Sequence, residues 1–145
     1  MWLVEGLVAG LIAGILMGIA TEIGYRLGLL KSNLVIVDGS FALRFMNRSE
    51  SSIAVYVLGT LIHLVTSMVF GIVYVILAMP FGFDTRMILA IFVYVFVLWI
   101  SMLLFALPVA GQGIMGKKIS RMVWAEQLVL HIIFGLGFWW ALELI

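Results

Sequence analysis

The 145-residue chain contains no cysteine, only two prolines and few charged side chains. The lack of cysteine excludes disulfide bonds, thiolate metal sites, cysteine-ligated iron–sulfur clusters and a cysteine nucleophile. Charged residues make up 10% of the chain, whereas they make up about a quarter of a typical soluble domain. Since 66% of the residues are hydrophobic, too few polar side chains remain to cover a globule in water. The composition predicts a multi-pass protein of the cell membrane.

What the chain does contain is a set of long apolar segments, each longer than or close to the roughly 20 residues that cross a bilayer as a helix. These segments are residues 2–30, 52–79, 87–107 and 122–145. We therefore expect an all-α fold, namely an integral membrane four-helix bundle that forms a single transmembrane domain over residues 1–145.

Basic residues gather in two of the three connections and at the span ends beside them. They are Arg26, Lys31, Arg44, Arg48, Lys117, Lys118 and Arg121. Only Arg86 lies on the opposite side. Because cytoplasmic loops carry an excess of Lys and Arg, we expect connections 31–51 and 108–121 to face the cytoplasm. Both termini are then expected on the outer side.

The first of these cytoplasmic connections holds a short apolar run, residues 34–37, which is too short to span a bilayer. Asp38-Gly39 follows it directly and is a turn signal. Residues 41–46 are expected to form an interfacial segment.

Glycine recurs at every fourth position of the first segment. The row is Gly6, Gly10, Gly14 and Gly18, and Glu22 ends it. Small residues with this spacing let two membrane helices approach backbone to backbone. We interpret the row as a packing surface within the chain. The alternative is an oligomer joined through the first helices.

The two histidines of the chain both lie inside predicted spans. His63 follows Tyr56 by seven residues, as His131 follows Trp124, and Tyr and Trp favour the membrane interface. At ~1.5 Å per residue, both histidines are expected about 10 Å deep, counted from the cytoplasmic interface. The polar residues predicted near this depth form a candidate cluster. Its members are Glu22, His63, Gln127 and His131, with Glu126 at its rim.

Four interpretations of the histidines stay open. Two histidines at equal depth on two helices suit axial ligation of a b-type haem. With Glu22 they would instead form a metal site, since imidazole and carboxylate suit zinc or iron. A proton relay is the third option, because imidazole titrates near neutral pH. In the fourth, each histidine hydrogen-bonds a neighbour such as Ser67 or Thr60 and only locks helix packing.

A resemblance rests on three groups of residues. They are His63 with Gly71 and Tyr74, Pro108 with Gly111, Gly113 and Gly116, and His131 with Gly135. On these residues the chain resembles a family of uncharacterised small prokaryotic membrane proteins with four helices, a domain of unknown function. The resemblance implies the four-helix architecture and brings no established activity.

Three hypotheses for the function follow. The first is a small membrane subunit or partner protein of a respiratory or redox assembly, in which His63 and His131 hold a haem or a metal ion. The second is a proton- or ion-handling membrane protein that uses Glu22 with the histidines. The third is a structural or assembly protein without a cofactor. The expected partners are the lipid bilayer and a homo-oligomer or larger membrane complex, not nucleic acid; no enzymatic activity is assigned.

Overall fold

The computed structural model describes residues 1–49 and 51–145. Over these residues the regular structure is entirely helical, which confirms the all-α prediction for them. The helices in chain order are α1 (Trp2–Arg26), α2 (Leu34–Phe45), α3 (Ser52–Phe81), α4 (Ile88–Ser101), α5 (Leu107–Val109) and α6 (Val123–Leu144). A π-helical turn, Met102–Ala106, joins α4 to α5, and a 3₁₀ turn, Ile114–Gly116, precedes α6.

Four of the helical segments are long and apolar enough to cross a membrane, as the sequence predicts. They are α1, α3, the continuous segment Ile88–Val109 and α6. The helix ends differ from the predicted spans by up to four residues, and two of these differences have a local cause. α1 ends at Arg26 because Gly28 takes a positive φ of 73° and the N–H groups of Leu29 and Leu30 turn back to the Gly24 carbonyl. α3 continues through Pro80 to Phe81 and ends at Gly82, which has a φ of 63°.

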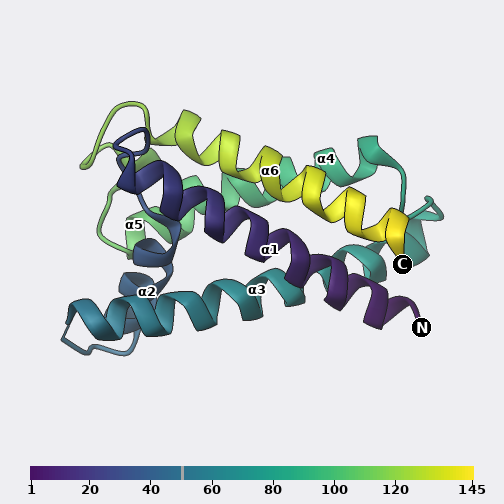
Figure 1. Ribbon diagram of the computed structural model, residues 1–145, viewed down its shortest axis with the longest axis horizontal. Coiled ribbons are helices and arrows are strands. Elements are labelled where there is room, and N and C mark those ends of the chain that lie inside the picture. Colours follow the sequence, from purple (N-terminus) through teal and green to yellow (C-terminus); the bar gives the residue numbers. More distant parts are fainter. Residues whose placement is uncertain (50) are drawn as a thin grey trace.

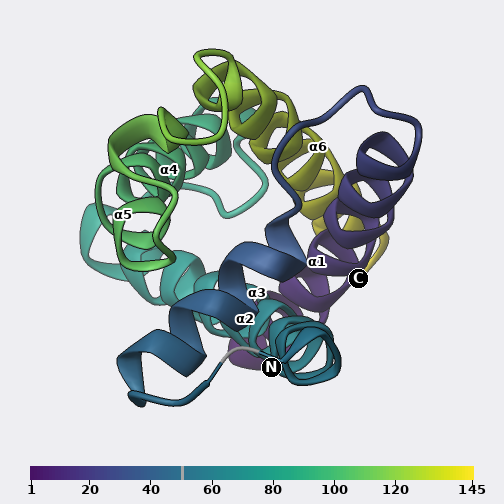
Figure 2. The same cartoon turned by 90° about the vertical axis from the view of Figure 1, so that its left-hand side faces the viewer.

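The four long helices run along the long axis of the molecule, and both termini lie at the same end (Figure 1). α1 packs extensively against both α3 and α6, and α6 also packs against α4. In the described part of the chain, α3 and α4 are not among the closely packed helix pairs, although they follow each other in sequence. Viewed from the end opposite the termini, α2 crosses in front of α3 (Figure 2).

α2 is the main departure from the sequence-based expectation. The predicted turn at Asp38-Gly39 is wrong, because both residues lie in the middle of this 12-residue helix. Asn33 begins the helix as its N-cap, since its side-chain oxygen accepts hydrogen bonds from the backbone N–H groups of Val35 at 2.9 Å and Ile36 at 3.4 Å.

Gly39 serves close helix packing rather than a turn. A Cβ at Gly39 would lie 2.0 Å from the Val55 carbonyl oxygen of α3. The contact is reciprocal, because a Cβ at Gly59 of α3 would lie 2.0 Å from the Val35 carbonyl oxygen of α2. These two glycines let the backbones of α2 and α3 pack closely. The close packing places Asp38 of α2 within hydrogen-bond distance of His63 of α3.

Candidate functional site

The glycine row of α1 lies against α3. A Cβ would lie 2.6 Å from the Gly71 carbonyl oxygen at Gly6, and 2.3 Å from the Ser67 carbonyl oxygen at Gly10. At Gly14 it would lie 2.5 Å from the Ser67 hydroxyl oxygen. At Gly18 the nearest atom is Cδ2 of His63, at an ordinary contact distance of 3.5 Å. The row therefore faces the interior of this chain and ends beside a histidine ring.

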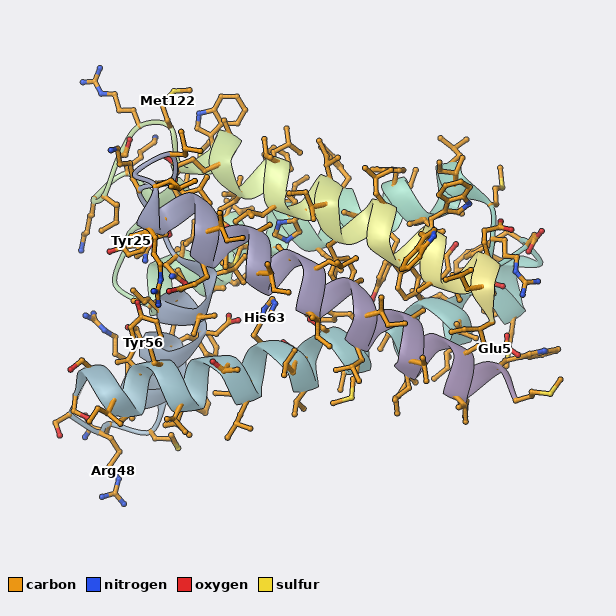
Figure 3. All side chains as sticks on the ribbon, in the orientation of Figure 1. Glu5, Tyr25, Arg48, Tyr56, His63 and Met122 are labelled. Carbon is orange, nitrogen blue, oxygen red and sulfur yellow. The ribbon has the colours of Figure 1, made fainter. Side chains whose placement is uncertain are left out.

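His63 points from α3 into the space between α3 and α1 (Figure 3). Both of its ring nitrogens are engaged by the protein. Nδ1 lies 3.2 Å from Oδ2 of Asp38, and Nε2 lies 2.9 Å from the carbonyl oxygen of Gly14. The side chains of His63 and Asp38 are only 6% and 17% exposed. The site thus joins three elements, α1, α2 and α3.

The hydrogen-bond partners assign the protons of this pair. A carbonyl oxygen only accepts, so Nε2 of His63 carries a proton and donates it to Gly14. A second proton lies between Nδ1 and the Asp38 carboxylate, either on the imidazole or on the carboxyl. In both arrangements the pair is neutral overall, which lowers the cost of its burial. Removal of the shared proton would leave a net negative charge in the interior.

The Asp38 carboxyl lies on α2, outside the four long helices. Burial raises its pKa above the usual range, and the hydrogen bond with His63 opposes this rise. Sequence reasoning missed Asp38 as a site residue because Asp-Gly is a common turn pair. The signal that identifies it is the capping residue Asn33, which predicts a helix that would bury a carboxylate among apolar neighbours.

His131 on α6 is bonded differently. Its Nδ1 lies 2.8 Å from the carbonyl oxygen of Gln127, one turn earlier, and therefore donates a proton to it. Nε2 then carries a lone pair, and it has no hydrogen-bond partner among the described residues. The residue is 8% exposed. His131 offers an acceptor nitrogen, whereas His63 has none to offer.

His63 lines two cavities. The first, of about 530 Å³, extends between α1 and α3 past Gly18 to Glu22 and Arg26. The second, of about 360 Å³, is lined by Asp38, His63 and His131 together with apolar side chains. The structure therefore brings the two predicted histidines to one cavity, and it places Glu22 in the other.

In the part of the chain that the structure describes, the two acidic residues of the predicted cluster, Glu22 and Glu126, do not bond the histidines. They bond residues of the connection between α1 and α2 or next to it. Glu22 accepts hydrogen bonds from the Arg26 guanidinium and, at 2.7 Å, from the side-chain amide of Asn33. Oε2 of Glu126 accepts from the backbone N–H groups of Lys31 at 2.8 Å and Ser32 at 3.2 Å. Both carboxylates thus hold the segment that leads from α1 into α2.

Gln127 is completely buried. Neither its side-chain nitrogen nor its side-chain oxygen has a hydrogen-bond partner in the described structure. Its backbone carbonyl is the group that positions His131.

The residues present do not fit the cofactors considered from the sequence. Within residues 1–49 and 51–145, no three or more His, Asp or Glu side chains converge to hold a metal ion, so Glu22, His63 and His131 form no such set. Axial ligation of a haem by two histidines needs an unoccupied ring nitrogen on each, and both nitrogens of His63 already bond the protein.

The fold and the site define a class: a helical protein with four helices able to span a membrane and a buried histidine–aspartate pair that links α3 to α2. Comparison of the chain with protein-family models, curated proteins and solved structures gives no match. The resemblance to small prokaryotic four-helix membrane proteins therefore stays a prediction.

Proposed function

We propose that the chain is an integral membrane four-helix protein of the cell membrane, with both termini on the outer side. Large apolar side chains such as Ile19, Val65, Val93 and Leu136 are exposed on the four long helices, which suits contact with lipid. The end opposite the termini carries the connections rich in basic residues, with Arg48 at that end and Glu5 at the other (Figure 3). By the positive-inside rule, this charge asymmetry favours the connections in the cytoplasm.

We further propose that the protein handles protons through the His63–Asp38 pair. The observation that carries this proposal is the position of His63, which borders both cavities while its two ring nitrogens bond Gly14 and Asp38. An ionisable residue inside a membrane span is costly and commonly belongs to a proton or ion pathway. In this proposal Asp38, and not Glu22 as the sequence hypothesis had it, is the carboxylate that handles protons together with a histidine.

The protons of the pair suit this role. The first cavity leads from His63 toward Glu22, Arg26 and Tyr56, near the basic end of the molecule. The second borders Asp38. Loss of the shared proton to one cavity leaves a buried negative charge, which strongly favours uptake of a proton from either cavity. Release and uptake on different sides would move a proton between the two cavities.

Proton uptake into vesicles tests the proposal. The purified protein is reconstituted in liposomes that enclose a pH-sensitive dye, and a potassium gradient with valinomycin drives protons inward. We expect uptake faster than in protein-free liposomes, and at least a tenfold slower rate for Asp38→Asn and His63→Gln. Asp84→Asn makes the same chemical change in the α3–α4 connection and should keep the wild-type rate. Uptake that equals the protein-free rate, or that Asp38→Asn leaves unchanged in a folded protein, refutes the proposal.

A further inference from the structure

The second cavity has the size and lining of a small-molecule site. Its volume of about 360 Å³ lies within the range of roughly 300–1,000 Å³ that is typical of ligand pockets. All the helices of membrane-spanning length and α2 contribute to its wall. Its aromatic lining consists of Phe41, Phe70, Phe105 and Phe134. Aromatic side chains favour stacked or edge-to-face contacts with a flat ring.

Two of the polar side chains that line the cavity, His131 and Asp38, present hydrogen-bond acceptors without a protein partner within residues 1–49 and 51–145; the other polar residues of the lining are His63, Thr66, Ser67 and Ser101. His131 lines it, and the bond from Nδ1 to the Gln127 carbonyl leaves Nε2 as an unpartnered acceptor on a residue that is only 8% exposed. Asp38 lines the same cavity and uses Oδ2 for His63, while its Oδ1 has no partner among the described residues. Both acceptors line the cavity without a protein partner in the described part of the chain, so a ligand that donates hydrogen bonds to them gains affinity here.

The exposed aromatic residues of the cavity lining lie on α3 and just after α4, from which we infer that its mouth is on that side. Phe70 of α3 is 38% exposed, and Phe105, in the π-helical turn after α4, is 69% exposed. Met102 and Ala106 of that turn also line the cavity. π-Helical turns inside α-helices occur frequently at functional sites. Because both mouth residues lie on apolar helices of membrane-spanning length, a ligand would enter from the lipid phase.

We propose that this cavity binds the hydroquinone headgroup of a lipid-soluble carrier, with one hydroxyl donating to Nε2 of His131. The flat ring fits between the phenylalanine side chains, and the apolar tail leaves through the mouth beside Phe70 and Phe105. The second hydroxyl is available to Asp38. The oxidised quinone has no hydrogen to donate to Nε2 of His131 or to Asp38, so these two acceptors favour the reduced form. Binding needs only the cavity and His131, and therefore does not depend on proton movement through His63.

Binding of matched ligands tests this site. Decylubiquinol, decylubiquinone and the dimethyl ether of the quinol are titrated anaerobically into the protein in lipid nanodiscs, with empty nanodiscs as the partitioning control. We expect the quinol to bind at least tenfold more tightly than either of the others. We also expect 1-decanol, which donates a hydrogen bond but has no ring, to bind at least tenfold more weakly than the quinol.

Variants then assign the binding to the cavity. His131→Leu should remove the preference for the quinol, His131→Gln should retain part of it through the amide oxygen, and Asp84→Asn should bind as the wild type does. Ala106→Phe enlarges a side chain that lines the cavity and should abolish binding of every ligand. Equal binding of the three ring compounds to the wild type overturns the proposal, as does binding of decanol as tight as that of the quinol. A folded His131→Leu protein that keeps the preference also overturns it.

Discussion

Replacement of Gly39 by alanine tests whether the close contact of α2 with α3 holds Asp38 against His63. The added Cβ would lie 2.0 Å from the Val55 carbonyl oxygen, whereas ordinary contacts begin at 3.4 Å. Because the opposing atom belongs to the backbone of α3, it cannot rotate away, and the helices must separate by more than 1 Å. The bond between Nδ1 of His63 and Oδ2 of Asp38 is already 3.2 Å long, so this separation breaks it.

The magnitude follows from two opposing effects. Overpacking against a rigid backbone costs about 2 kcal/mol, whereas the higher helix propensity of alanine over glycine contributes about 1 kcal/mol in the other direction. Loss of a buried hydrogen bond to a charged group adds about 1–3 kcal/mol. We therefore expect Gly39→Ala to lower the free energy of unfolding by about 2–4 kcal/mol.

Two measurements check this expectation. Unfolding by sodium dodecyl sulfate in mixed micelles gives the stability, and nitrogen NMR of the His63 ring reports the bond to Asp38. Gly18→Ala is the matched control, because its Cβ would meet only the His63 ring, at 3.5 Å. That variant should be as stable as the wild type or slightly more stable. If Gly39→Ala matches the control in stability and leaves the His63 resonances unchanged, then the close contact does not position Asp38.

Two further predictions concern the same region. Asn33→Ala removes the cap of α2 and the hydrogen bond to Glu22, and it should lower the free energy of unfolding by about 1–2 kcal/mol in the same micelle assay, whereas Asn33→Asp keeps the cap oxygen and loses only the donor to Glu22. The raised pKa of Asp38 means that the folded state binds its proton more tightly than the unfolded state, whose reference value is 3.8. The stability gained from this proton is present at low pH and is lost as the pH rises through the folded-state pKa. The free energy of unfolding of the wild type, measured relative to Asp38→Asn, should therefore fall with rising pH, and a flat difference would contradict the pKa direction.

The sequence predicts the long helices well because their signal is local. An uninterrupted apolar segment identifies a helix of spanning length without any knowledge of its neighbours, and α1, α3 and α6 begin within one residue of the predicted spans. The position of α2 depends on non-local contacts. The packing of Gly39 on Val55 is not visible in the local sequence pattern, in which Asp38-Gly39 is a typical turn pair.

The two histidines show where the sequence stops being informative about the site. Seven-residue spacing from Tyr56 and Trp124 predicts that His63 and His131 lie at a similar depth, and both do line one cavity. Spacing along a helix says nothing about which acceptor each ring nitrogen meets. Both ring nitrogens of His63 bond groups of two other helices. His131 instead bonds a carbonyl of its own helix through Nδ1, and its Nε2 stays available. The pair that equal depth suggests is therefore two different groups: one holds a proton with Asp38, and the other presents an acceptor to a ligand. Exchange of the two properties would require a change in the neighbouring helices and not in the histidines themselves.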